Sequence, residues 1–228
     1  MIRIVLSLLV VLFCHFNCLS QRINKIPPNK PKLIVGIVIE QMRYDYLYRF
    51  WDRYGENGFK KLVNSGAVCK NTRIQYAFTQ SCPGLASIST GANPSGHSII
   101  ADEWYDRVKE KTVNAVLDES AKIIVGQEKD KNCSPMRLIS TTFGDELKSS
   151  SPQSKVISVS LNASSAILLA GHKADGAYWL DEISGEWTTS TYYRQSLPMW
   201  ISDFNGKHLD DVYHNRSWVP MLPITNYQ

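Results

Sequence analysis

Two near-continuous apolar runs constrain the fold of this chain more than any other feature. One run covers residues 33–39 and the other residues 155–161, and both are rich in Val and Ile. Such runs are typical of strands buried on both faces of a parallel sheet. Helices are predicted over residues 44–50, 58–65, 83–90 and 137–149, and a β-hairpin is predicted with arms at 178–180 and 187–193. This alternation predicts an α/β fold with a mainly parallel sheet.

The first 31 residues are predicted to lie outside this fold. A short basic start, an apolar run from Ile4 to Phe13 and small residues before Gln21 have the order of a secretory signal over residues 1–20. A proline-containing linker follows over residues 21–31. The apolar run is short for a membrane span, although a retained anchor and a lipid on Cys18 stay as alternatives. We therefore expect an exported chain, periplasmic or extracellular, without a membrane span after signal removal.

Composition excludes several classes of protein. Twenty-five basic and 21 acidic residues give a net charge of +4, which is too dilute for a nucleic-acid-binding surface. An apolar content of 43% excludes a disordered chain. Five cysteines are too few for a disulfide scaffold of this size. Signal removal would leave Cys69, Cys82 and Cys133, so one disulfide at most can form, and the sequence indicates no pairing.

Three segments are expected at the carboxyl ends of strands, where ligands of α/β proteins bind. They contain Glu40, the turn around Ser81, and Asn162 with Ser164. Ser81 precedes a predicted short helix, whose N-terminus favours negative charge such as phosphate. Its hydroxyl can either cap that helix or attack an ester, and local sequence alone favours capping.

Several ordered sequence blocks resemble one known family. They look like the alkaline phosphatase superfamily, in the branch of type I phosphodiesterases and nucleotide pyrophosphatases, and most like the exported bacterial phosphate-irrepressible alkaline phosphatases. The resemblance implies that residues 32–228 are the N-terminal part of such a domain, with a mainly parallel sheet flanked by helices and a β-hairpin insertion. The blocks are Val38–Arg43, Tyr76–Ile88, Ser89–Ile100, Trp104–Arg107, Ser158–Leu161, Ala166–His172 and Ala177–Tyr193.

The resemblance also implies an activity, the hydrolysis of phosphoesters of small molecules. The resemblance further implies that this reaction uses two bound zinc ions. By position, Glu40 and Ser81 correspond to metal ligands, and Ser81 also corresponds to the nucleophile that becomes phosphorylated. Asp102, Asn162 and Ser164 correspond to residues that contact the substrate. All five differ from the usual residues of the subgroup, which are Asp, Thr, Asn, Lys and Arg in that order.

These departures leave a second function open, a non-catalytic exported binding module of the same fold. The Asp and His ligands that the family supplies from its later half are missing from this sequence. The segment from His208 to His214 could be a metal cluster, but its spacing fits no standard site and favours a solvated loop. His97 is interpreted as a packing residue. We therefore expect weak or no hydrolysis by this chain alone.

Overall fold

The computed structural model describes residues 31–127, 132–213 and 216–227. The predicted signal segment and nearly all of the predicted linker lie outside these residues. The chain divides into two compact units, Met1–Lys60 and Lys61–Gln228, with the boundary inside helix α3. No helix in the described ranges is both long and apolar enough to cross a membrane.

In the described part of the first unit, the regular elements are all helical. It contains α2 (Tyr46–Arg49), a 3₁₀ turn (Trp51–Arg53) and the start of α3 (Phe59–Ser65), which fits the two helices predicted here. The strand predicted over residues 33–39 is wrong, because this run forms no strand and its side chains are largely exposed, Leu33 at 78%. A strand exists only when a neighbour completes its hydrogen bonds, and this run has no ladder partner among the described residues.

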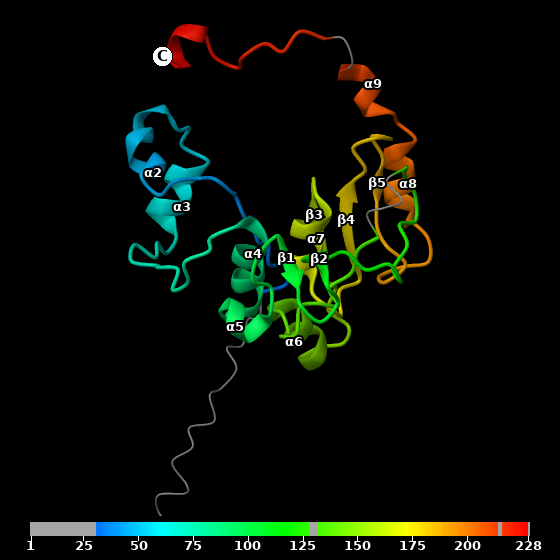
Figure 1. Cartoon of the computed structure of the whole chain (residues 1–228). Coiled ribbons are helices and arrows are strands. Elements are labelled where there is room, and N and C mark those ends of the chain that lie inside the picture. Colours follow the sequence, from blue (N-terminus) through cyan, green and yellow to red (C-terminus); the bar gives the residue numbers. More distant parts are fainter. Residues whose placement is uncertain (1–30, 128–131, 214–215, 228) are drawn as a thin grey trace, which may run out of the picture. The chain divides into compact units, whose positions relative to one another are not determined.

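The second unit holds both sheets and the helices around them (Figure 1). Its elements in chain order are α4 (Ser81–Thr90), α5 (Pro94–His97), β1 (Glu103–Asp106), β2 (Lys111–Asn114), α6 (Phe143–Ser150), β3 (Ile157–Ser160), α7 (Ala163–Ala170), β4 (Gly176–Leu180), β5 (Trp187–Thr188), α8 (Met199–Asn205), α9 (Leu209–Tyr213) and a 3₁₀ turn (Ile224–Tyr227).

Strand pairing confirms the α/β fold and the predicted hairpin. β3 pairs in parallel with β4, and helix α7 connects them as in a βαβ unit. β4 pairs with β5 in antiparallel fashion, with Trp179 opposite Thr188, so this sheet has the order β3–β4–β5 and is mixed. β1 and β2 form a separate antiparallel hairpin.

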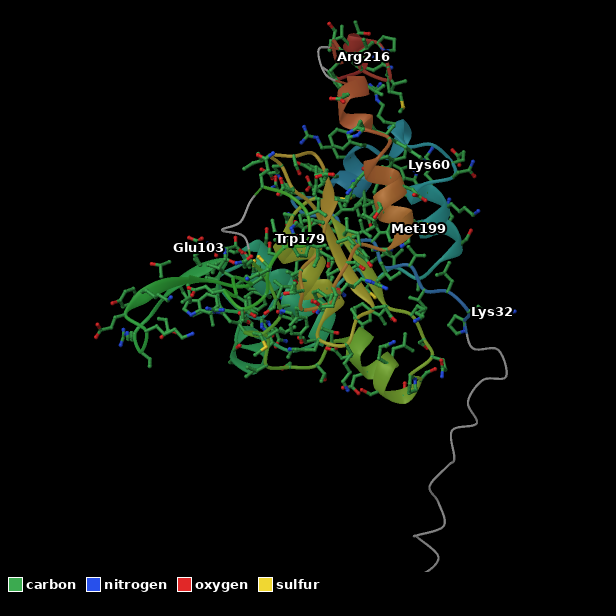
Figure 2. The ribbon with its side chains drawn as sticks, turned by 90° about the vertical axis from the view of Figure 1, so that its right-hand side faces the viewer. Lys32, Lys60, Glu103, Trp179, Met199 and Arg216 are labelled. Atoms are coloured by element: carbon green, nitrogen blue, oxygen red, sulfur yellow. The ribbon has the colours of Figure 1, made fainter. Side chains whose placement is uncertain are left out.

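The core of the second unit lies between α7, α4 and the three-stranded sheet. α7 packs against β3, β4 and α4, and its Ile167 and Leu168 are fully buried. Trp179 of β4 is also buried, and Figure 2 labels it within the sheet. The prediction that β3 is buried on both faces is wrong, because Ile157 and Val159 are more than half exposed.

Helix boundaries follow the capping residues. α6 begins at Phe143 and not at Arg137, because Thr142 and Asp145 form a capping box that fixes the first turn. α7, which the sequence analysis did not predict, begins after Asn162, whose side chain accepts a hydrogen bond from the Ser165 N–H. It ends at Ala170, and Gly171 follows with a φ of +77°.

Candidate functional site

Ser81 is the first residue of α4 and is exposed, while the two residues after it are buried. The helix was expected to begin near Pro83, and it begins two residues earlier. Gln80 is the N-cap, so Ser81 does not cap the helix. Helix capping, which the local sequence favoured for this hydroxyl, is therefore not its role. Ser81 lies on the exposed first turn of the helix, where the helix dipole is positive.

Asp102 lies at the same helix terminus as Ser81. Its Oδ1 accepts a hydrogen bond from the Cys82 N–H at 2.7 Å, and its own N–H donates to Gln80 Oε1 at 2.7 Å. These two bonds join the loop before β1 to the residues on either side of Ser81. The carboxylate takes a place in the first turn of α4 that could otherwise bind an external anion.

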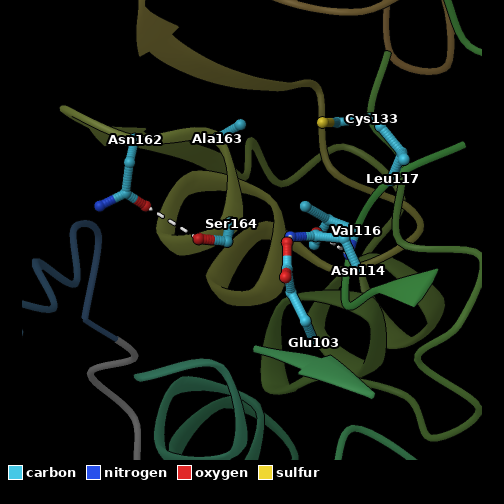
Figure 3. Close-up of a pocket in the computed structure, with 8 residues that line it drawn as sticks. All are labelled: Glu103, Asn114, Val116, Leu117, Cys133, Asn162, Ala163 and Ser164. Atoms are coloured by element: carbon cyan, nitrogen blue, oxygen red, sulfur yellow. Dashed lines mark hydrogen bonds between the residues drawn. The ribbon is translucent and has the colours of Figure 1, made fainter. Parts of the chain in front are cut away.

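Asn162 and Ser164 begin α7 and line a cavity of about 350 Å³. The Asn162 Oδ1 accepts from the Ser165 N–H at 2.9 Å and from the Ser164 hydroxyl at 3.0 Å, a contact drawn in Figure 3. The two side chains are therefore largely engaged in capping their own helix. Neither carries the positive charge that a phosphate dianion favours.

Glu40 belongs to the first unit, where it lies in a turn after the unpaired apolar run. Its role as a metal ligand together with Ser81 stays a prediction. The structure thus brings Asp102 to the turn that carries Ser81, through its bonds to Cys82 and Gln80, and it bonds Asn162 to Ser164 at the start of α7. It does not test the roles that the resemblance implies for any of the five residues.

The donor set around Ser81 does not fit a zinc ion by itself. The described residues contain no group of three or more His, Cys, Asp or Glu side chains that could hold a metal. Structural zinc sites use four protein ligands and catalytic sites use three. Near Ser81, the Asp102 Oδ1 already accepts the N–H of Cys82. The segment after His208 forms the short helix α9 and not a loop, while His214 lies outside the described residues.

A second serine on α4, Ser87, has His97 as its hydrogen-bond partner. This serine and histidine cannot act as a nucleophile and its general base. His97 is fully buried, and burial lowers the pKa of its imidazole. Its Nδ1 accepts the Ile99 N–H at 3.1 Å, so Nε2 carries the proton and donates to the Ser87 hydroxyl at 3.0 Å. An imidazole that donates to the hydroxyl cannot accept its proton, and the interpretation of His97 as a packing residue is confirmed.

Two features were not predicted from the sequence, one at the cavity at the start of α7 and one in the loop after α7. Glu103, the first residue of β1, lines the cavity directly beside Asp102, and no motif in the sequence indicates it. Asp145 is 1% exposed and collects hydrogen bonds from the backbone N–H groups of Thr142, His172 and Lys173. The Thr-x-x-Asp spacing is a capping-box signal, so the local role of Asp145 was readable.

Comparison with known proteins identifies the family. Residues 34–220 match the family described as type I phosphodiesterase / nucleotide pyrophosphatase, which is most of the chain. The chain belongs to this family. The suspected resemblance and the α/β fold are thereby confirmed.

Alignment with several relatives shows what share of their length this chain covers. It is 41% identical to alkaline phosphatase PhoV of Synechococcus elongatus, over 99% of the chain and 42% of PhoV. It is also 41% identical to alkaline phosphatase PafA of Elizabethkingia meningoseptica, over 91% of the chain and 38% of PafA. The crystal structure of wild-type PafA superposes with a TM-score of 0.82, covering 87% of this chain and 39% of that one. The chain thus spans about two fifths of the relatives it matches.

Proposed function

We propose that this chain is the N-terminal part of an exported, metal-dependent phosphoester hydrolase of the alkaline phosphatase type. The observation that carries the proposal is the position of Ser81 on the exposed first turn of α4. This places a hydroxyl where the backbone and the helix dipole favour a phosphoryl group. Phosphorylated small molecules in the periplasm or outside the cell are the proposed substrates.

A variant of PafA supports the proposed site residues. Its crystal structure carries a threonine replaced by serine, and an asparagine, a lysine and an arginine replaced by alanine. The threonine and asparagine lie 21 positions apart there, and Ser81 and Asp102 are 21 positions apart here. The lysine and arginine lie two positions apart, as Asn162 and Ser164 do. The same spacing within each pair favours the proposed correspondence of these positions.

In the proposed reaction, the Ser81 Oγ forms a bond to phosphorus as the bond from phosphorus to the alcohol oxygen breaks, and the proton lost by Ser81 balances the one gained by the departing alcohol. Water then cleaves the phosphoserine, which releases phosphate and regenerates the hydroxyl. Asn162 and Ser164 contact the substrate as neutral groups, and Asp102 borders the phosphoryl site. A carboxylate about 5 Å from a phosphate charge costs about 3 kcal/mol at an effective dielectric constant near 20. The described residues do not form a zinc site, so the proposed metal dependence, with Glu40 and Ser81 as ligands, needs further ligands.

A chimera gives the direct test. Residues 32–220 of this chain replace the matching two fifths of PafA, and hydrolysis of aryl phosphate mono- and diesters is measured. We expect hydrolysis that is retained in Ser81→Thr, lost in Ser81→Ala and unchanged in Ser202→Ala, which changes an exposed hydroxyl on α8. This chain alone, with added Zn²⁺, should show no turnover. A folded chimera that is no faster than its Ser81→Ala form would overturn the proposal.

That negative result would favour the second candidate, a non-catalytic binding module. One observation supports it: the Asp102 carboxylate already holds an N–H of the helix terminus that a phosphoryl group would use. The two candidates therefore differ in one measurable property, the dependence of turnover on the Ser81 hydroxyl.

A further inference from the structure

The cavity at the start of α7 has a composition that suits a small organic ligand. Its volume of about 350 Å³ lies at the lower end of the range for ligand pockets. Four polar residues and four apolar ones line it, and the Glu103 carboxylate is the one formal charge among them (Figure 3). The lining consists of Glu103, Asn114, Val116, Leu117, Cys133, Asn162, Ala163 and Ser164.

The position of Glu103 relates the cavity to the proposed phosphoryl site. Glu103 follows Asp102 directly in the chain, and the Asp102 carboxylate binds the Cys82 N–H next to Ser81. The residue that binds the turn carrying the proposed nucleophile and the residue that lines the cavity are therefore consecutive in the chain. Such a position suits the alcohol portion of a phosphoester rather than its phosphoryl group.

The hydrogen bonding of Glu103 leaves capacity for a ligand. Glu103 is paired with Asn114 across the β1–β2 hairpin, and its Oε1 accepts from Asn114 Nδ2 at 3.4 Å. This is a long hydrogen bond, and an ionised carboxylate can accept about four. The side chain is exposed, so a water-soluble ligand can reach it.

The sign of the charge selects the ligand. Asn162 and Ser164 are neutral and bonded to each other, so the cavity wall offers no cation to balance an anion. A second negative charge near Glu103 would be repelled by the carboxylate, whereas an ammonium group would form charge-assisted hydrogen bonds with it. Val116, Leu117 and Ala163 supply apolar surface for a short carbon chain.

We propose that this cavity binds a small organic ammonium group through the Glu103 carboxylate, and that the phosphoester substrate carries an amino alcohol. The second half of this statement rests on the proposed function. The first half does not, because the cavity can bind an amino alcohol that has no phosphoryl group.

The probe is ethanolamine, titrated into the intact chain at neutral pH and followed by NMR chemical shifts of the backbone amides. We expect saturable shifts at residues that line the cavity and affinity about tenfold weaker in Glu103→Gln. Glu119→Gln, which changes an exposed carboxylate outside this cavity, should leave the affinity unchanged. Propanol and inorganic phosphate serve as neutral and anionic comparison probes and should bind more weakly than ethanolamine.

Equal ethanolamine affinity in the Glu103→Gln variant would overturn the proposal, as would tighter binding of phosphate than of ethanolamine. Thermal unfolding of both variants separates a lost ligand contact from a damaged fold. Because ethanolamine contains no phosphorus, this result is independent of whether Ser81 is a nucleophile. Failure of hydrolysis in the chimera with intact ethanolamine binding would remove the proposed function and keep the ammonium site.

Discussion

Replacement of Asp145 by alanine should strongly destabilise the second unit. The carboxylate accepts backbone N–H groups from Thr142 at 2.8 Å, His172 at 2.8 Å and Lys173 at 2.6 Å. It also contacts the His172 imidazole, with Nδ1 3.3 Å from Oδ2. These bonds connect the start of α6 to the loop after α7. One side chain thus satisfies the polar groups of two segments that are far apart in the sequence.

The magnitude follows from this inventory. A hydrogen bond to a charged group contributes about 1.5–3 kcal/mol, and removal of one partner from a buried ionic pair costs about 3–5 kcal/mol. We expect Asp145→Ala to lower the free energy of unfolding by about 3–5 kcal/mol. Asp145→Asn keeps the volume and one acceptor oxygen, so about 2 kcal/mol is expected for it. Glu146→Gln, on the exposed neighbour in the same helical turn, should cost less than about 1 kcal/mol.

The pH dependence gives a second readout. Burial opposes ionisation of Asp145, but its hydrogen bonds from His172, Thr142 and Lys173 outweigh burial and hold its pKa well below the usual range. The hydrogen bond to Asp145 raises the pKa of His172 despite partial burial. The Asp145 contribution is present above about pH 4 and lost as the pH falls through its folded pKa, while the His172 contribution is present below about pH 6.5 and lost as the pH rises through its folded pKa. Their combined stabilisation is therefore largest between these two values.

Urea unfolding of the intact chain, repeated across pH, measures both effects. The free energy of unfolding of the wild type should exceed that of Asp145→Ala by the largest amount between about pH 4 and pH 6.5. An alanine variant within 1 kcal/mol of wild type would refute the reasoning. So would a difference between the two proteins that stays constant over the whole pH range.

Three further substitutions test other features. Asp102→Asn keeps an acceptor for the Cys82 N–H but removes the charge, so phosphate should bind the chimera about 100-fold more tightly, as measured by calorimetry. Gly171→Ala places a Cβ 2.6 Å from the Asp145 carboxylate at a φ of +77° and should cost about 2–3 kcal/mol in urea unfolding. Burial raises the pKa of Asp175, but hydrogen bonds from Val156, Lys155 and Lys148 outweigh burial and lower this pKa to about 2. Asp175→Asn should therefore lower the free energy of unfolding by about 2 kcal/mol at pH 7, and this loss should disappear as the pH falls from about 4 to about 2.

Each of these substitutions has an internal control or a contrary outcome. Unchanged phosphate affinity in Asp102→Asn would mean that the carboxylate does not face the phosphoryl site. Gly91→Ala, at a φ of +68° with nothing within 4 Å of the added Cβ, should cost only about 1 kcal/mol, and an equal loss at both glycines would contradict the steric argument. A cost for Asp175→Asn that persists at pH 2 would exclude its charge as the cause.

The sequence predicted the elements that depend on local signals. Gly66 and Gly91 follow helices close to their predicted ends, and the hairpin arms pair across residues 181–186 as expected. The apolar run over residues 33–39 has the composition of a buried strand, but composition does not supply the partner that a strand requires. The start of α4 near Ser81 was predictable, whereas the bond from Cys82 to Asp102 joins residues 20 apart, and only folding brings them together.

The open side of β3 affects how this chain behaves at high concentration. In the described part of the chain its sheet ends at β3, and the side chains of Ile157, Val159 and Leu161 are more than half exposed. An edge strand that contains neither a lysine nor a proline is a template for pairing with another chain. We expect two copies to pair along this edge at high concentration, with the apolar side chains strengthening the association. Self-association would make unfolding midpoints rise with protein concentration, so the free energies discussed above refer to dilute solution.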